Sequence, residues 1–564
     1  MKTPREDRPP AAGKEAREPA PPCVLFEDEH LLVVNKPPGM NTHAPSPYAG
    51  EGLYDWLRHR EPRWAALAII QRLDKETSGT IAFSKTPLGN HSLTQQFTQR
   101  QVQKNYVLIT DRRPPEKQFT VRSSLARAGE RQVVRAWRAG GETAETQFRV
   151  MDEPEAQGVL GKGLAGRVLN ATNRLWVLEA KPLTGRTHQI RAHAAHRGMP
   201  ILGDVLYGGT PAARVFLHAL DLAFRHPSSG DQIRFRALPE FAGDPRAQVR
   251  AAVISPELTD TSRLVHGASD GWPGWYVDRL GKYLLSQSEA TLSPEQQKVL
   301  EHLLATFHGR GVYLKVLSRQ VRQAGPASYS PRLLLGEPAS AAFTARENGN
   351  QFELSFQEGY SVGLFLDQRD NRRRVLTGHV AAGFPLSLSP NLDVLNGFAY
   401  TCGFSVCAAR AGARTTSVDL SRKYLEWGRR NFELNQLDPA EHEFLAGDMF
   451  DWLRRFHKQQ RRFDLILLDP PTFSQSKQSG AFQVERDFGK LVTAAARVLK
   501  SGGVLFASSN AARWAPEDFV QSINAAVVVG GRKVVQSFYA PQPPDFPITR
   551  AEPGYLKTLW LRLD

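Results

Sequence analysis

Cysteine is scarce in this sequence. Its 564 residues include only Cys23, Cys402 and Cys407. Three unevenly spaced cysteines are too few for a disulfide framework or a zinc cage, so we expect neither. The same scarcity is typical of proteins from a reducing compartment, and we expect a cytoplasmic location with no bound metal.

Long apolar runs are also missing. No stretch approaches the roughly 20 apolar residues that a membrane-spanning helix requires, so we expect no membrane partner. Residues 1–22 are rich in proline, alanine and charge and contain no apolar segment, which does not fit a secretory signal. Because such a composition cannot bury a core, we predict that residues 1–22 form a disordered tail.

Acidic residues are outnumbered by basic ones. The chain has 72 Lys and Arg against 57 Asp and Glu, a net charge of +15. This balance slightly favours a polyanionic partner such as nucleic acid over a basic surface that binds no ligand. The length alone predicts about three to four domains.

The spacing and order of apolar segments change along the chain. Residues 23–245 mix short β-branched runs with turns, which predicts an α+β domain with a mostly antiparallel sheet. After a polar, turn-rich stretch at 237–250, residues 251–345 read as a small β-rich α+β unit. Residues 346–564 alternate short apolar strands with helical segments, which predicts an α/β, Rossmann-like doubly wound parallel sheet.

The first chemical signal is Asp74, which follows an apolar strand within the stretch Gln71–Gly79. On its own, an Asp-Lys turn closed by Thr-Ser-Gly favours a purely structural reading. A second stretch, Leu183–His193, is dense in Arg, His and Gln and is hard to explain as a solvated face. An arginine there could pair with a buried carboxylate and keep it ionised.

These stretches resemble the RluA-type RNA pseudouridine synthases. The resemblance covers most of residues 23–240 in the family's order and extends to the segments 34–40, 104–106, 198–209 and 216–224. One departure is Gln71, where the family motif usually begins with His.

The resemblance implies roles for individual residues. Asp74 matches the catalytic aspartate, which either attacks the ribose anomeric carbon or assists proton removal from the sugar. Tyr106 matches the tyrosine that stacks on the base and acts in proton transfer, and Arg186 matches the arginine that pairs with the aspartate. Three cations are expected to contact RNA phosphates and so help to unstack the target uridine: Arg72, Lys104 and Arg191. An isomerisation of this kind needs no cofactor.

The second signal is a strand, a small-residue turn and a helix over 393–405. A helix N-terminus at such a turn favours the polar part of a nucleotide-like ligand. Acidic residues follow the next strands: Asp419, Asp448 and Asp469. Each could be a simple cap, but several at consecutive strand ends outline a ligand crevice at the carboxyl edge of the sheet.

This order resembles the class I S-adenosylmethionine-dependent methyltransferases, and among them the ribosomal large-subunit RNA methyltransferases of the RlmI/RlmK type. The resemblance covers about 251–564, including a middle unit similar to the domain that precedes the catalytic one. The segments that carry it are 263–281, 363–372, 396–405, 418–435, 468–477 and 486–503. One departure is Cys402, where the family often has Gly.

The implied cofactor is S-adenosylmethionine. Asp419 would bind its ribose and Asp448 its adenine amine. The residues implied on its methionine side are Asn396, Phe398, Tyr400 and Gly403. Gln368 and Arg369 match a segment that approaches the cofactor. Asp469 would lie beside the methyl group and the target base, and Phe473 could stack on that base.

The absence of a suitable cysteine bears on the methylated atom. Methylation of cytosine C5 needs a thiolate that adds to the ring. The expected position carries Ser508, Ser509 and Asn510, and we read Cys402 and Cys407 as packing residues. We therefore expect a ring nitrogen or exocyclic amine as acceptor, most of all on guanine.

The sequence thus predicts a bifunctional RNA-modifying enzyme that isomerises uridine and methylates a base, with 23S ribosomal RNA as the expected substrate. In one alternative only one half is catalytic and the other is an RNA-binding platform. In another the chain is a non-catalytic ribosome-assembly protein that binds RNA. A small-molecule methyltransferase would leave the fusion and the charge unexplained.

Overall fold

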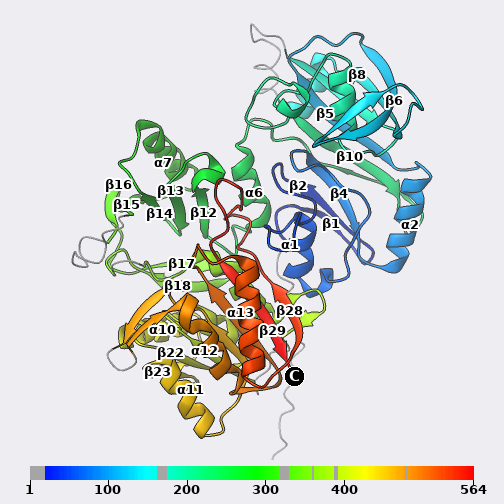
Figure 1. Ribbon diagram of the computed structural model, residues 1–564. Helices are drawn as coiled ribbons and strands as arrows, with labels where there is room; N and C mark the ends of the chain where they lie inside the picture. The colour runs from blue at the N-terminus through cyan, green and yellow to red at the C-terminus, as the bar shows by residue number, and fades with distance from the viewer. Residues whose placement is uncertain (1–19, 162–174, 318–329, 359–360, 387–391, 477–479) are drawn as a thin grey trace, which may run out of the picture.

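The computed structural model describes residues 20–161, 175–317, 330–358, 361–386, 392–476 and 480–564. Residues 1–19 of the predicted disordered tail lie outside these ranges. Among the described helices, none combines the length and the apolar character needed to cross a membrane. Figure 1 shows the arrangement of the elements, with the N-terminal part in blue and cyan and the C-terminal part in yellow and red.

The N-terminal part is built on one large sheet. Its strands are β1 (Val24–Glu27), β2 (Leu31–Lys36), β3 (Ala68–Ile69), β4 (Ser78–Ser84), β5 (Gln103–Thr110), β6 (Gln118–Ala128), β7 (Arg131–Arg135), β8 (Glu142–Val150), β9 (Trp176–Pro182), β10 (Leu217–Arg225) and β11 (Gln232–Arg236). The order is β1-β2-β4-β10-β5-β9-β8-β6-β7, with β3 on β4 and β11 on β10. Only β4 and β10 pair in parallel, so the predicted mostly antiparallel sheet is confirmed. The helices are α1 (Leu53–Arg60), α2 (Pro87–Thr98), α3 (Glu153–Leu160) and α5 (Gln189–His196).

The centre of this sheet brings together distant parts of the chain. Strand β4 starts four residues after Asp74, and its neighbour β10 pairs on its other side with β5, which carries Tyr106. The approach of β4 to β10 requires a glycine, because a Cβ on Gly79 would lie 2.3 Å from the carbonyl oxygen of Ala219. Gly79 also has a φ of +117°, which side chains disfavour. The central strands therefore place Asp74 and Tyr106 at one site.

A smaller unit follows the large sheet. Helix α6 (Pro245–Val253) leads into β12 (Thr261–His266), β13 (Trp275–Leu280), β14 (Tyr283–Ser288), α7 (Pro294–Thr306), β15 (Gly311–Val316) and β16 (Arg332–Gly336). These strands form one sheet in chain order, and the hairpin β17 (Phe343–Glu347) and β18 (Asn350–Leu354) comes next. Strands β13 and β14 pair as an antiparallel hairpin. The predicted boundaries near 250 and 345 fall within α6 and β17.

The C-terminal part is a seven-stranded sheet with helices on both faces. Before the sheet come α8 (Arg369–Thr377) and the short strands β19 (His379–Ala381) and β20 (Phe384–Pro385). The sheet and its helices are β21 (Asp393–Gly397), α9 (Gly403–Arg410), β22 (Arg414–Asp419), α10 (Arg422–Leu434), β23 (Glu443–Ala446), α11 (Met449–Lys458), β24 (Phe463–Leu468), α12 (Val484–Ala496), β27 (Leu499–Ser509), α13 (Pro516–Val529), β28 (Val534–Tyr539) and β29 (Lys557–Leu563). A small hairpin, β25 (Phe473–Ser476) and β26 (Gly480–Gln483), precedes α12.

The strand order is β23-β22-β21-β24-β27-β29-β28. The first five strands are parallel, which confirms the predicted doubly wound sheet. The last two are antiparallel to their neighbours. The described residues between β28 and β29 include no helix, which is usual for antiparallel neighbours.

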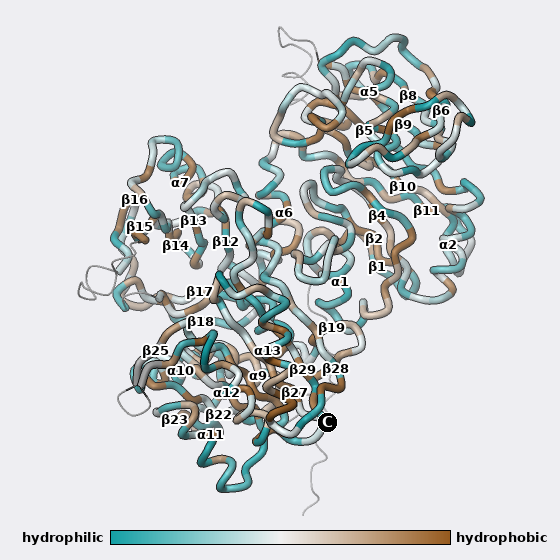
Figure 2. The backbone as a smooth tube through the Cα atoms, in the orientation of Figure 1, coloured by the Kyte–Doolittle hydropathy of each residue, from teal (hydrophilic) through white to brown (hydrophobic). Residues whose placement is uncertain are grey.

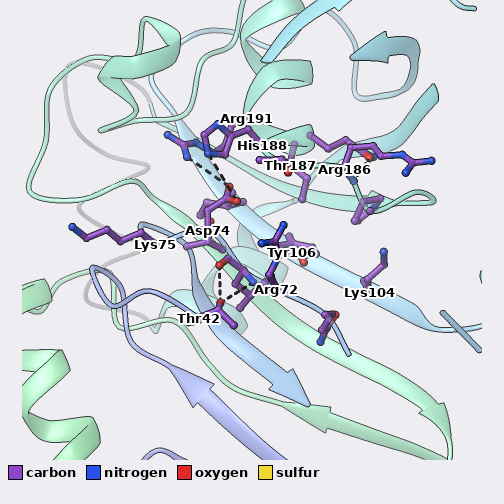
Figure 3. A pocket seen from close by; sticks show the side chains of 18 of the residues that line it. Thr42, Arg72, Asp74, Lys75, Lys104, Tyr106, Arg186, Thr187, His188 and Arg191 are labelled. Carbon is purple, nitrogen blue, oxygen red and sulfur yellow. Dashed lines mark hydrogen bonds and ion pairs between the residues drawn. The ribbon is translucent and has the colours of Figure 1, made fainter. Parts of the chain in front are cut away.

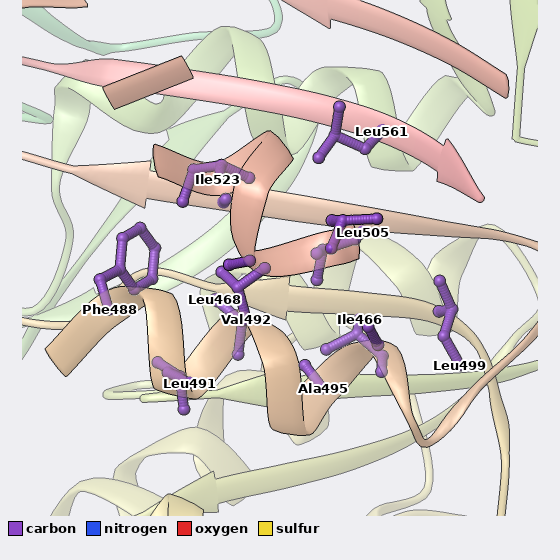
Figure 4. Packing of buried hydrophobic residues seen from close by; sticks show 14 of the residues in the cluster. Ile466, Leu468, Phe488, Leu491, Val492, Ala495, Leu499, Leu505, Ile523 and Leu561 are labelled. Atoms are coloured by element: carbon purple, nitrogen blue, oxygen red, sulfur yellow. The ribbon is translucent and has the colours of Figure 1, made fainter. Parts of the chain in front are cut away.

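The C-terminal core lies where α11, α12 and α13 cover one face of this sheet. Figure 4 shows α12 side chains such as Phe488 and Leu491 packed against Ile466 and Leu468 of β24. Brown apolar stretches follow the strands of both large sheets in Figure 2. Because the helices cover the faces, the carboxyl ends of the parallel strands stay available as a crevice.

Candidate active sites

The first site is a cavity of about 430 Å³ in the N-terminal part. It collects most of the residues that the sequence singled out there. Figure 3 shows Asp74, Tyr106, Arg186, Arg191, Arg72 and Lys104 around it. Two segments more than 100 residues apart, 70–77 and 182–191, thus form facing walls.

The Asp74 turn is fixed by its neighbours. The Thr42 hydroxyl donates to the carbonyl of Leu73 at 2.8 Å, and the N–H of Leu73 lies 3.2 Å from the same hydroxyl oxygen. Lys36, which is fully buried, donates from Nζ to the carbonyl oxygens of Pro37, Met40 and Lys75. These bonds tie the Asp74 turn to the end of β2, and the Asp74 carboxylate faces the cavity.

Sequence reasoning assigned no role to Lys36 or Thr42. The signal for Lys36 was present, since it is a charged residue at the end of the apolar run Leu31–Val34. Burial lowers the pKa of Lys36 to about 7, against the attraction of Glu76 and Asp74. A lysine so placed acts as a clamp on backbone carbonyls.

The predicted pairing of Arg186 with Asp74 is wrong in this structure. Arg186 donates to Glu142 at 2.6 Å and to the carbonyl of Thr143 at 3.2 Å. The arginine beside the carboxylate is Arg191, whose Nη1 lies 3.6 Å from Oδ2 of Asp74. The physical reason is the position of α5, which begins between the two arginines and turns Arg191 inward.

Arg191 was predicted to contact phosphates, and this also needs correction. Its side chain is only 3% exposed and forms a bidentate pair with buried Asp204, at 2.7 and 2.8 Å. Burial opposes its charge, but the bonds to Asp204 and the charge of Asp74 raise its pKa overall. Arg191 is therefore a permanent cation held rigidly beside Asp74.

Two further groups face Asp74. Nε2 of His188 lies 4.0 Å from Oδ1 of Asp74, and Nδ1 of the same ring is hydrogen-bonded to the Tyr207 hydroxyl at 3.0 Å. Burial and the nearby Asp74 charge raise the pKa of Tyr106 well above its ordinary value. Tyr106 therefore keeps its proton at neutral pH and can act as a hydrogen-bond donor.

The remaining predicted cations border the cavity. Arg72 is exposed. Lys104 donates to the carbonyl of Thr184 at 3.3 Å, and burial together with Arg100 lowers its pKa to about 8. Both residues line the cavity.

The second site lies at the carboxyl ends of β21, β22 and β24. Asp419 ends β22, and its Oδ2 and Oδ1 accept the N–H groups of Tyr400 and Ser421 at 2.9 and 2.8 Å. Burial raises the pKa of this carboxyl, and the two N–H groups oppose the rise. One N–H bond to each oxygen leaves lone pairs on both that can accept from a diol.

The loop after β21 has an unusual backbone. Phe398, Tyr400 and Cys402 all have φ between +48° and +63°, a region that costs energy for residues with side chains. The N–H of Ala399 donates to the carbonyl of Val418, so the loop is tied to β22 as well as to Asp419. These bonds hold the strained loop in place beside Asp419.

The structure accommodates Cys402 at the position where glycine was expected. Its side chain is fully buried, and a Cβ on Gly428 of α10 would lie 2.3 Å from its Sγ. The missing side chain at Gly428 therefore provides the space for the cysteine.

Three other residues predicted to bind the cofactor contact or begin the helices that follow the strands. Asn396 is 2% exposed and donates to Ser405 Oγ in α9 at 2.9 Å. Gly403 begins α9. Asp448 caps α11, because its Oδ1 accepts from the N–H groups of Phe450 and Asp451.

Asp469 follows β24 and is held by an amide. Gln368 donates from Nε2 to Oδ2 of Asp469 at 3.0 Å and to Oγ of Ser508 at 2.8 Å. Burial raises the pKa of Asp469 to about 6, although the bond from Ser508 opposes the rise. The carboxylate is thus poised as a hydrogen-bond acceptor near neutral pH.

Arg369, predicted to contact the cofactor, has a different partner. Its two terminal nitrogens donate to the two oxygens of buried Asp545 at 2.8 and 2.7 Å. Because the guanidinium is committed to this bidentate pair, Arg369 is a structural residue and this prediction needs correction.

The donor set of this crevice fits S-adenosylmethionine. It offers a strand-end carboxylate for a ribose (Asp419), a tight loop leading to a helix N-terminus (Phe398–Gly403) and a further acidic strand end (Asp448). Phe473 begins β25 and is 39% exposed.

No cysteine of this chain can supply a thiolate at the crevice. Cys23 belongs to the N-terminal part, and Cys402 and Cys407 are buried, with the pKa of both thiols raised by burial to about 12. Ser508 stands fully buried beside Gln368. The predicted packing role of the two cysteines therefore agrees with the structure.

Comparison with known proteins matches two segments of the chain to family models. Residues 30–196 match the model described as RNA pseudouridylate synthase, and residues 263–562 match the model described as S-adenosylmethionine-dependent methyltransferase. The chain is 34% identical over 325 residues to a ribosomal RNA large subunit methyltransferase of Deinococcus radiodurans, an alignment of 56% of this chain and 76% of the relative.

Two further relatives carry similar names. Ribosomal RNA large subunit methyltransferase K of Neisseria meningitidis serogroup B is 37% identical over 224 residues, 39% of this chain and 59% of that protein. Ribosomal RNA large subunit methyltransferase I of Escherichia coli O139:H28 is 32% identical over 306 residues, 53% of this chain and 73% of that protein.

Proposed function

Because this chain belongs to the S-adenosylmethionine-dependent methyltransferase family and carries an RNA pseudouridylate synthase domain, we propose that it makes two modifications in large-subunit ribosomal RNA. The N-terminal part isomerises uridine to pseudouridine, and the C-terminal part methylates a base, in the cytoplasm. The names of the relatives support this choice of RNA. The net charge of +15 suits a polyanionic substrate.

The observation that carries the first activity is Asp74 facing a cavity with Arg191 at 3.6 Å. In this proposal the flipped uridine enters the cavity and the Asp74 carboxylate acts on its ribose, either by attack at the anomeric carbon or by proton removal. Tyr106 stacks on the base and donates a hydrogen bond or a proton. Arg72 and Lys104 contact the RNA backbone.

The second activity rests on the neighbouring strand ends that carry Asp419 and Asp469. In this proposal Asp419 binds the cofactor's ribose, Asp448 its adenine amine, and the loop from Phe398 to Gly403 its methionine end. When bound, the cofactor supplies an electrophilic methyl group. Gln368 and Asp469 orient the acceptor base, and Phe473 stacks on it.

We place the methyl group on guanine, at N7 or the exocyclic amine. A guanine N7 holds a lone pair and needs no covalent helper, whereas cytosine C5 requires a thiolate. The buried, high-pKa cysteines of this chain argue against the cytosine reaction.

The decisive experiment is mass spectrometry of digested ribosomal RNA from cells with the gene, without it, and with Asp74→Ala or Asp419→Ala alleles. We expect the deletion to lose one pseudouridine and one methylated guanine. Asp74→Ala should lose only the pseudouridine, and Asp419→Ala only the methyl group.

Other patterns would support the alternatives. Loss of only one modification on deletion means that one half is an RNA-binding platform. Loss of neither, with ribosome assembly impaired, identifies a non-catalytic assembly protein. Methyl transfer to free metabolites but not to RNA identifies a small-molecule methyltransferase.

A further inference from the structure

The two halves of the chain meet through α1 of the N-terminal part and α8 of the C-terminal part. Figure 1 shows α1 beside the C-terminal sheet. The indole N–H of Trp56 donates to Oδ2 of Asp370 at 3.3 Å, across 314 residues of sequence. Arg373 donates to Glu61, the C-cap of α1, at 2.5 Å. These are buried contacts between the halves.

Helix α8 is made of polar residues that are nevertheless buried. Its first six positions read Arg-Asp-Asn-Arg-Arg-Arg, and each is at most 7% exposed. Buried charges are tolerated only when they are paired, so partners rather than apolar packing determine where this helix lies. Arg369 pairs with Asp545 and with Asp370, and Arg372 pairs with Glu347. Asp370 also accepts from Trp56 of α1, and Arg373 pairs with Glu61, the C-cap of that helix.

A chain of hydrogen bonds leads from α8 to the methyl-transfer crevice. Asn371 accepts from the Trp560 indole at 3.2 Å and donates from Nδ2 to Oε1 of Gln368 at 2.8 Å. This bond sets the orientation of the Gln368 amide, because it assigns the oxygen as the acceptor. The amide nitrogen then donates to Asp469 and Ser508. The place of α8 therefore determines where Gln368 holds Asp469.

We propose that Trp56 and Glu61 of the uridine-isomerising half are positioning residues for methyl transfer, because they hold α8 where Gln368 orients Asp469. The N-terminal part is then a structural component of the second active site as well as a catalyst. No residue of α8 is among the described residues that line the cavity holding Asp74, so we expect the contact with α8 to affect isomerisation little. This inference rests on the proposed function of the C-terminal half.

The test uses full-length Trp56→Phe, which removes one hydrogen bond to α8, and Glu61→Gln, which removes the negative charge of one ion pair with α8; both lose little volume. The matched control is Trp64→Phe. Trp64 is also fully buried and donates its indole N–H to a glutamate at 2.9 Å, but that partner, Glu27, lies in the same half. Isomerisation, methylation, cofactor affinity and thermal unfolding are measured for all three variants.

We expect the two α8-facing variants to lower kcat of methylation about tenfold or more, because small misplacements of orienting groups have large effects on rate. Cofactor affinity by calorimetry and the isomerisation rate should stay within about twofold, since Asp419 and Asp74 are not touched. The control should leave methylation unchanged. A loss of folding alone would lower both activities together and overturn the proposal.

A charge swap between Glu61 and Arg373 provides a second test. Glu61→Arg should lose methylation, and combining it with Arg373→Glu should restore it at least partly, because the pair is rebuilt with opposite polarity. Failure of the swap, together with unchanged methylation in Trp56→Phe and Glu61→Gln, overturns this inference while the proposed function stands. If the wild-type protein transfers no methyl group to RNA, the proposed function fails and this inference fails with it.

Discussion

Arg191 stands between two aspartates: its Nη1 lies 3.6 Å from the carboxylate of Asp74, and Nε and Nη2 bind Asp204 at 2.7 and 2.8 Å. Asp204 therefore fixes the guanidinium plane, and the remaining nitrogen, Nη1, faces both Asp74 and Glu76, with Oε2 of Glu76 at 3.4 Å. A planar, permanently charged group suits this double role better than an ammonium would.

This geometry predicts that Arg191→Lys lowers the isomerisation rate by about a hundredfold. A lysine cannot bind both oxygens of Asp204 and at the same time hold a positive charge beside Asp74. The matched variant Arg186→Lys should keep the rate within a few-fold, since Arg186 is engaged by Glu142. Single-turnover assays on a uridine-containing RNA compare the two. The reverse ranking would restore Arg186 as the partner of Asp74.

The raised pKa of Asp469 predicts that replacing this carboxyl group stabilises the protein at high pH. Burial raises its pKa from 3.8 to about 6, so folding favours the protonated form, and the stabilising contribution of this group is lost as the pH rises through 6. Asp469→Asn should therefore abolish methylation, yet stabilise the protein by about 1–3 kcal/mol at pH 8. Towards pH 4 this difference should vanish. Thermal unfolding at both pH values checks the sign, and equal stability at pH 8 would contradict it.

The position of Asp419 predicts that replacing it weakens cofactor binding without affecting isomerisation. Asp419→Ala should weaken S-adenosylmethionine binding about 10- to 100-fold, because a charged acceptor for the ribose hydroxyls is lost. Titration calorimetry measures the affinity, and Asp451→Ala on the surface of α11 serves as the control. Isomerisation should be unaffected in both variants. An unchanged affinity in Asp419→Ala would refute the ribose role.

The contact between Cys402 and Gly428 predicts a compensating pair. Gly428→Ala should destabilise the protein by about 1–3 kcal/mol, since its Cβ would lie 2.3 Å from Sγ of Cys402. Adding Cys402→Gly removes the clash and suits the φ of +63°, so the double variant should regain most of the loss. Denaturant unfolding of the single and double variants measures the coupling. Additive effects would show that the two residues do not share one space.

Much of the candidate chemistry could be read from local sequence. Asp74, Asp419 and Asp469 each follow an apolar strand, and chain order alone places strand ends of a parallel sheet along one edge. The sequence could not tell which arginine faces Asp74. Arg186 and Arg191 are five residues apart on either side of a helix start, and the choice depends on how α5 packs against the large sheet.

The sequence by itself determined the two families, the alternation of strands and helices, and the carboxylates available to each site, because these are set by residue type and short-range spacing. Only the tertiary structure decided the partners: Arg191 beside Asp74, Gly428 beneath Cys402, and α1 against α8. The physical reason is that a buried charge is paired, or an unfilled space is occupied, by whichever group the packing brings near. The local sequence around residues 56 and 370 does not indicate that these two residues are in contact.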